Sequence, residues 1–119
     1  MPRRHKGSIQ RVSVLGSGKV SEKDPIYQQA LKLGAALAGE GFTVYHGGYR
    51  GVMEAVAKGC RSAGGRNIAV TIKGSSSRAN AFSDAEIKML SWKDRLFKLI
   101  EKGEAYIFLD GATGTLNEL

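Results

Sequence analysis

The sequence predicts an α/β fold with a doubly wound parallel sheet and crossover helices. Short β-branched and aromatic runs alternate along the chain with longer segments of helical periodicity, and glycines stand at most junctions between them. This alternation is typical of parallel sheets, because each parallel strand needs a crossover connection to reach the next. The 119 residues suffice for one domain, which we expect to span residues 11–119 after a basic tail at residues 1–10.

The first strand and helix follow that tail. The run RVSVLG at 11–16 is typical of a buried strand and breaks at a glycine. A helix is expected from Pro25 to Gly41, with Asp24 as its N-cap. Its buried face is predicted from the apolar residues at helical spacing, which are Ile26, Ala30, Leu33 and Leu37.

The middle of the chain repeats this alternation. A second strand is expected at 42–48, a second helix at 51–65 and a third strand at 66–74. A polar loop follows, and the run EIKML at 86–90 is a candidate short strand.

The last helix is predicted at 91–103, with Ser91 as N-cap and Asp94 favourable to the helix dipole. Its buried arc is predicted to hold Trp92, Leu96, Phe97, Leu99 and Ile100. A further strand at 104–110 leads into a glycine-rich loop.

The net charge, the cysteine content and the hydrophobic pattern of the sequence limit the classes of function that this protein can have. The net charge is +7, and part of it comes from Arg3, Arg4, Lys6 and Arg11. Two interpretations of this basic cluster are possible, namely a solvated tail and a segment with affinity for nucleic acid. The remaining positive charge would suit an anionic small molecule. Cys60 is the single cysteine and has no partner for a disulfide or at metal spacing. No apolar run is long enough for a membrane span, and we expect a cytoplasmic protein.

Ligands of open α/β sheets bind in loops at the carboxyl ends of strands, and two such loops follow the first two strands. The loop LGSGK contains Gly16 and Ser17 but lacks the third glycine of a dinucleotide fingerprint. It is therefore either a tight turn without a ligand or a loop that contacts the ligand. In HGGYRGVME, Gly47 and Gly48 allow close approach of a ligand, and Gly51 allows the next helix to pack on the sheet. Packing alone is the alternative explanation, and no Walker-type phosphate loop is present.

Two later segments also carry candidate site residues. Arg95 lies near the start of its helix and either reaches the ligand crevice or pairs with a carboxylate on the surface. After the last strand, Gly111 and Gly114 permit a nest of backbone N–H groups, and Thr113 and Thr115 add hydroxyls for an anion. The acidic residue three positions after Thr115 either completes a capping box or acts on the sugar of a ligand.

Together HGGYRGVMEAVAKG, Arg95 and DGATGTLNE resemble the LOG-type Rossmann proteins, formerly possible lysine decarboxylases and better known as cytokinin riboside 5'-monophosphate phosphoribohydrolases. The resemblance covers residues 11–119. It implies a Rossmann-like fold and hydrolysis of a nucleoside 5'-monophosphate to a free base and ribose 5-phosphate, with no metal or other cofactor and a homodimer at full length. Catalysis is implied for Arg95 and Glu118. The implied phosphate- or nucleotide-binding residues are Gly16, Ser17, Gly47, Gly48, Gly51, Met53, Gly111, Thr113, Gly114 and Thr115.

The sequence also departs from the family pattern. Asp110 stands where the family has proline. Glycines of the family signatures are replaced by His46, Glu54 and Ala112, and the lysine of the Arg-Lys pair is replaced by Leu96. The segment GVMEAVAKG is closer to the molybdenum cofactor carrier branch, which implies binding of a phosphorylated ligand without cleavage as an alternative. Binding of single-stranded nucleic acid is the least favoured reading, because no aromatic residues alternate with basic ones. Too few residues follow Gly114 for a stable helix, so we expect a chain truncated at its carboxyl end, with weak activity or none.

Overall fold

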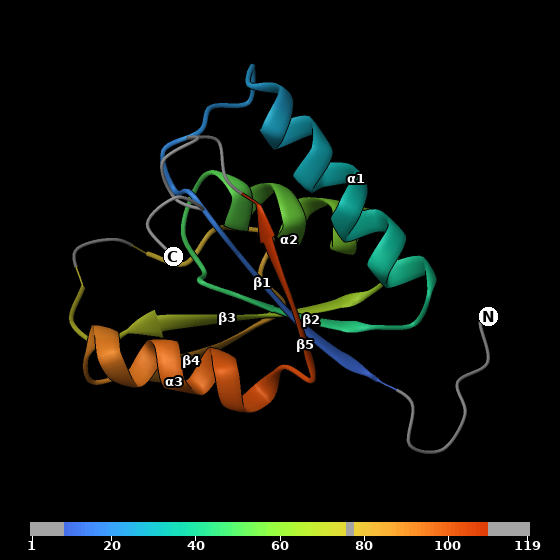
Figure 1. Ribbon diagram of the computed structural model, residues 1–119. Coiled ribbons are helices and arrows are strands. Elements are labelled where there is room, and N and C mark those ends of the chain that lie inside the picture. Colours follow the sequence, from blue (N-terminus) through green and yellow to red (C-terminus); the bar gives the residue numbers. More distant parts are fainter. Residues whose placement is uncertain (1–8, 76–77, 110–119) are drawn as a thin grey trace.

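The computed structural model describes residues 9–75 and 78–109, and all structural statements refer to these residues. They form five strands and three helices (Figure 1). In chain order the elements are β1 (Arg11–Gly16), α1 (Pro25–Gly39), β2 (Thr43–His46), α2 (Val52–Ser62), β3 (Arg66–Ile72), β4 (Ala85–Met89), α3 (Trp92–Lys102) and β5 (Ala105–Leu109).

The strands form one parallel sheet in the order β4-β3-β2-β1-β5. Val12 of β1 lies opposite Val44 of β2 on one side and Ala105 of β5 on the other. Helices α1 and α2 cover one face of the sheet and α3 the other (Figure 1). This arrangement confirms the predicted α/β class and the short strand at β4. The chain crosses back over β1 to place β5, and such a reversal creates a crevice at the carboxyl ends of the strands.

Helices α1 and α2 pack closely because each carries a glycine at their contact. A Cβ on Gly34 would overlap the carbonyl oxygen of Val56, and a Cβ on Gly59 would overlap that of Leu31. This contact corrects the predicted buried face of α1. The buried residues are Tyr27, Ala30, Gly34 and Leu37, whereas Ile26 and Leu33 are only partly buried.

The start of α1 corrects a detail of the prediction, and the start of α3 confirms one. Asp24 is the N-cap residue of α1, but its carboxylate accepts from the backbone N–H of Ser21 at 2.8 Å and caps no helical N–H. Ser91 caps α3 as predicted, since its Oγ accepts from the backbone N–H of Asp94 at 3.1 Å.

The predicted buried arc of α3 is wrong except for Leu99, which packs into the second core cluster with Tyr45, Ile68 and Val70. The other four members of the arc are 45–63% exposed: Trp92, Leu96, Phe97 and Ile100. The physical reason is that α3 covers its face of the sheet alone among the described residues. It contacts β1 to β4 through one row of side chains and leaves the aromatic residues of β5 exposed as well.

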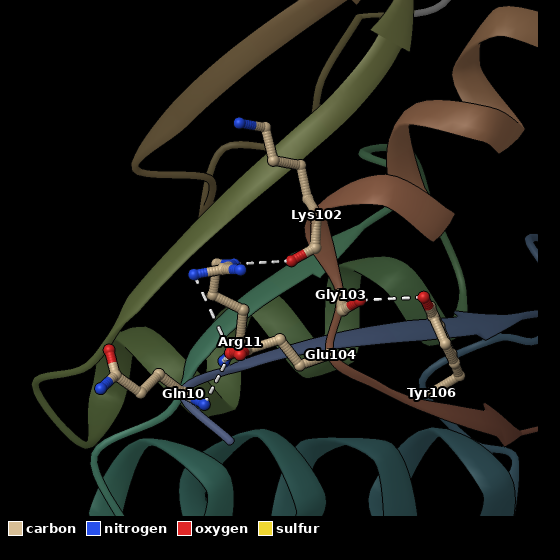
Figure 2. Close-up of polar contacts among 6 residues, drawn as sticks. All are labelled: Gln10, Arg11, Lys102, Gly103, Glu104 and Tyr106. Carbon is tan, nitrogen blue, oxygen red and sulfur yellow. Dashed lines mark hydrogen bonds and ion pairs between the residues drawn. The ribbon is translucent and has the colours of Figure 1, made fainter. Parts of the chain in front are cut away.

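The start of β1 is fastened to the turn between α3 and β5 (Figure 2). The backbone N–H groups of Gln10 and Arg11 donate to Glu104 Oε1 at 2.8 and 2.9 Å, and Arg11 Nε donates to the carbonyl of Lys102 at 2.8 Å. On the other side of this turn, the Tyr106 hydroxyl donates to the carbonyl of Gly103 at 2.9 Å. Arg11 therefore belongs to the sheet, as the strand predicted at 11–16 requires.

No helix within the described ranges is long and apolar enough to cross a membrane. The predicted boundary between tail and domain stays a prediction, because residues 1–8 lie outside the described ranges.

Candidate functional site

A cavity of about 1140 Å³ opens at the carboxyl ends of the strands, where the reversal of strand order predicts a ligand crevice. The loops after β1 and β2, the first turn of α2, the loop before β4 and the first turns of α3 build its walls. The lining residues are Leu15, Gly16, Gly18, Lys19, Gly47, Tyr49, Arg50, Met53, Glu54, Ser75, Arg78, Ala79, Asn80, Ala81, Trp92, Arg95, Leu96 and Leu99.

The loop after β1 is shaped by contacts within the protein. Gly16 packs against the carbonyl of Leu109 and the side chain of Val52, so that a Cβ there would overlap both. Hydrogen bonds hold Ser17 in this loop: its Oγ accepts from the backbone N–H of Lys19 at 3.1 Å, and its carbonyl oxygen accepts from the backbone N–H of Val52 at 2.9 Å. Gly16 and Lys19 line the cavity, whereas Ser17 does not.

Packing and backbone conformation explain the three glycines after β2. Gly48 and Gly51 have positive φ angles of 89° and 68°, which favour glycine. A Cβ on Gly47 would overlap the guanidinium of Arg95. Of the three, only Gly47 lines the cavity. The packing alternative therefore accounts for all three glycines, and Gly47 also leaves room for the arginine at the site.

A buried polar network fixes the start of this loop. The backbone N–H of Gly48 donates to His46 Nδ1 at 3.0 Å, so the neutral ring carries its proton on Nε2 and donates to Asn67 Oδ1 at 2.7 Å. Asn67 Nδ2 donates in turn to Asp84 at 3.1 Å. His46 is fully buried, and desolvation, opposed by the bond to Asn67, lowers its pKa to about 4. The imidazole is therefore neutral near pH 7.

Arg95 reaches the cavity and is held there by backbone carbonyls. Its Nε donates to Val70 O and its Nη2 to Gly47 O, both at 2.8 Å. The guanidinium carbon lies 5.4 Å from the ring centroid of Tyr49 and 5.1 Å from that of Trp92. Burial lowers the pKa of Arg95, although an arginine stays protonated in proteins. No carboxylate within the described ranges pairs with Arg95, and Nη1 makes no hydrogen bond there.

Opposite charges are unevenly divided along the cavity wall. Four cationic side chains line it: Lys19, Arg50, Arg78 and Arg95. Glu54 is the one carboxylate among the described lining residues. It accepts from the Tyr27 hydroxyl at 2.8 Å. Burial and this carboxylate raise the pKa of Tyr27 far above its ordinary value. The excess of positive charge suits an anionic ligand.

Only some of the predicted site residues line the cavity. Gly16, Gly47, Met53 and Arg95 line one cavity, whereas Ser17, Gly48 and Gly51 support its loops. Five predicted residues lie outside the described ranges: Gly111, Thr113, Gly114, Thr115 and Glu118.

Sequence reasoning passed over several cavity residues. Lys19 directly follows Gly18, and Arg50 directly precedes Gly51, so both stand next to a glycine of a strand–helix junction, and that position was an available signal. Asn80 had no such signal. Its side chain donates to the carbonyls of Gly48 and Tyr49 at 3.2 and 2.9 Å, which joins the polar loop before β4 to the glycine loop.

A metal centre finds no support in the described part of the chain, where no group of three or more His, Cys, Asp or Glu side chains could hold an ion. Cys60 is buried in α2, and burial raises the pKa of its thiol to about 11. A thiol with that pKa is protonated near neutral pH and is a poor nucleophile.

Known proteins resemble this chain along most of its length. It is 35% identical over 98 residues to a cytokinin riboside 5'-monophosphate phosphoribohydrolase of Mycobacterium tuberculosis, covering 79% of this chain and 52% of that protein. The crystal structure of TM1055 has a TM-score of 0.77 and 30% identity, covering 92% of this chain and 66% of that one. The molybdenum cofactor carrier protein of Chlamydomonas reinhardtii has a TM-score of 0.73 and 26% identity, with coverages of 93% and 68%. The chain thus spans about half to two thirds of the length of these proteins.

The comparisons confirm the resemblance inferred from the loop motifs, both to the LOG-type proteins and to the cofactor carriers. The model of the family described as the SLOG cluster4 family matches residues 9–119, which is nearly the whole chain. The chain therefore belongs to the SLOG cluster4 family.

Proposed function

We propose that this chain binds a phosphorylated small molecule of nucleotide size in the cavity at the carboxyl ends of β1 and β2. The observation that carries the proposal is the four cationic side chains around one space, set against a single described carboxylate. Such an excess attracts a phosphate, and arginine and lysine both donate charge-assisted hydrogen bonds to its oxygens. The volume of about 1140 Å³ is ample for a nucleotide.

The aromatic residues support a planar ring on the same ligand. Tyr49 and Trp92 line the cavity with their ring centroids 6.4 Å apart, and the Arg95 guanidinium lies over both rings. Aromatic and guanidinium groups both stack on planar heterocycles. A base and a phosphate on one molecule would use both features of the cavity.

We propose further that the reaction is hydrolysis of the N-glycosidic bond of a nucleoside 5'-monophosphate. The phosphoribohydrolase relative supports this reaction. In this proposal Gly111, Gly114 and Thr115 hold the phosphate, and Glu118 stabilises the positive charge that develops on the sugar or activates water. Arg95 orients the substrate or assists departure of the base through Nη1, since Nε and Nη2 are engaged by backbone carbonyls.

Binding without cleavage is the second candidate. The similarity to the Chlamydomonas carrier favours it, and so do the replacements at Asp110 and Ala112 in the loop proposed to hold the phosphate. A carrier would protect its ligand and release it unchanged.

The test compares AMP, adenosine and ribose 5-phosphate in thermal-shift titrations, with free adenine followed by chromatography in the same samples. Binding of a phosphorylated ligand predicts stabilisation by AMP and none by adenosine at equal concentration. Release of adenine from AMP identifies the hydrolase, and stabilisation without release identifies the carrier. Absence of any shift with both phosphorylated compounds would refute the binding proposal.

Two variants make this test specific to the cavity. Arg95→Ala should weaken the response to AMP, whereas Lys93→Ala, on the same helix but outside the cavity lining, should respond like the parent chain. Glu118→Gln should abolish adenine release while leaving the thermal shift in place, if the hydrolase proposal is correct.

A further inference from the structure

Among the described lining residues, Glu54 is the single negative charge in a cationic cavity. It is the third residue of α2, where the helix dipole favours a carboxylate, and it lines the same space as Lys19, Arg50 and Arg95. None of these cations forms an ion pair with it in the described part of the chain. A carboxylate repels phosphate, so a ligand that fits this cavity needs a neutral hydrogen-bond donor beside its anionic group.

Tyr27 fixes the orientation of this carboxylate. The tyrosine is only 2% exposed, and its ring belongs to the core cluster beneath α1 and α2. Its hydroxyl donates to Glu54 Oε2 at 2.8 Å, whereas no hydrogen bond within the described ranges engages Oε1. A carboxylate oxygen accepts up to two hydrogen bonds. Glu54 therefore offers the cavity an acceptor whose position is set by a rigid buried partner.

We propose that Glu54 accepts hydrogen bonds from the vicinal hydroxyls of a sugar in the bound ligand and that Tyr27 is its positioning residue. The inference rests on the proposed function and specifies its ligand as a phosphorylated ribose compound. In a nucleoside 5'-monophosphate the hydroxyls at C2' and C3' lie between the base-bearing C1' and the phosphate-bearing arm at C4', so a carboxylate and cations that line one cavity can serve adjacent groups of one ligand. Trp92, which suits a planar ring, comes from α3, and α3 covers the opposite face of the sheet from α1 and α2 (Figure 1).

The experiment uses Trp92, the only tryptophan of the chain, as a fluorescent reporter inside the cavity. AMP and 2',3'-dideoxy-AMP, which lacks both hydroxyls, are titrated against the parent chain. Hydrogen bonds to a charged group support a preference for AMP of roughly tenfold or more. Glu54→Gln should reduce the affinity for AMP toward that for the dideoxy compound, and Tyr27→Phe should shift it in the same direction by less.

Glu101→Gln is the matched control, since it removes a carboxylate from the exposed face of α3 outside the cavity lining and should keep the full preference. Thermal unfolding without ligand establishes that each variant is folded. If Glu54→Gln does not fold, the preference of the parent chain and the Tyr27→Phe variant still decide the question.

The outcomes separate this inference from the proposed function. Equal binding of AMP and the dideoxy compound by the parent chain overturns the role of Glu54 and leaves phosphate binding intact. Equal weakening of both ligands by Glu54→Gln also overturns it, because the effect of the carboxylate would then not depend on the two hydroxyls. If neither ligand changes the fluorescence or the unfolding temperature, the proposed function fails and this inference fails with it.

Discussion

The buried His46 makes the stability of this fold depend on pH, and the effect can be calculated from its environment. The ring is fully buried and its pKa is about 4, mainly because of desolvation. Hydrogen bonding to Asn67 and the charge of Asp84 raise this pKa, and the charge of Arg95 lowers it. In the unfolded chain the ring has the ordinary value of 6.5. The unfolded state therefore binds a proton more readily, and acid favours unfolding.

The magnitude follows from these two pKa values. The stability associated with the neutral ring is present above pH 6.5 and is lost progressively as the pH falls from 6.5 toward 4. At pH 5, proton binding to the unfolded state removes about 2 kcal/mol of unfolding free energy, and below pH 4 the loss reaches about 3 kcal/mol. Such losses are a large part of the stability of a small domain.

Urea denaturation of the parent chain and of His46→Gln between pH 7 and pH 5 measures this effect. The parent chain should lose about 2 kcal/mol more than the variant over this interval, because glutamine does not titrate. An NMR titration provides a second readout in the folded parent chain, where only His5 and His46 contribute imidazole signals. Equal pH dependence of the two proteins, or a His46 resonance that titrates near pH 6.5, would refute the reasoning.

Three further predictions concern packing, the ring site and association. Gly34→Ala should destabilise the fold by roughly 1–3 kcal/mol in urea denaturation, because its Cβ overlaps a carbonyl of α2. Gly39→Ala in the same helix meets no atom within 4 Å and should stabilise by about 0.5–1 kcal/mol; similar effects at both positions would contradict the packing argument. Trp92→Ala should weaken AMP severalfold in calorimetry and leave ribose 5-phosphate unchanged, whereas equal losses would argue against ring stacking. Phe97→Ser should lower self-association in sedimentation if the exposed apolar face of α3 pairs with a second copy, and an unchanged sedimentation coefficient would exclude this face.

The element order and the parallel class were accessible from the sequence because they depend on local signals. Periodicity distinguishes the strands from the helices, Ser91 marks the start of α3, and glycines end several elements. Short parallel strands joined by helices leave few topologies, since crossovers are right-handed. The same logic located the candidate site at the carboxyl ends of the strands, and Gly16, Gly47, Met53 and Arg95 do line the cavity found there.

The roles of individual residues were decided by contacts between distant parts of the chain. Local periodicity placed Phe97 and Ile100 in the buried arc of α3, but no second described element covers that side of the helix. Gly47 lines the cavity next to the guanidinium of Arg95, and this contact joins residues far apart in the sequence. The convergence of Glu54 with Tyr27 likewise required the close crossing of α1 and α2.

Local signals in the amino-acid sequence suffice to predict a parallel α/β domain with glycine-rich loops at one edge of its sheet. The tertiary structure decided that four cations, an aromatic pair and one oriented carboxylate share the cavity at that edge. The physical reason is that periodicity and capping act over a few residues along the chain. The charge, burial and orientation of a side chain depend on neighbours that only the folded sheet brings into contact.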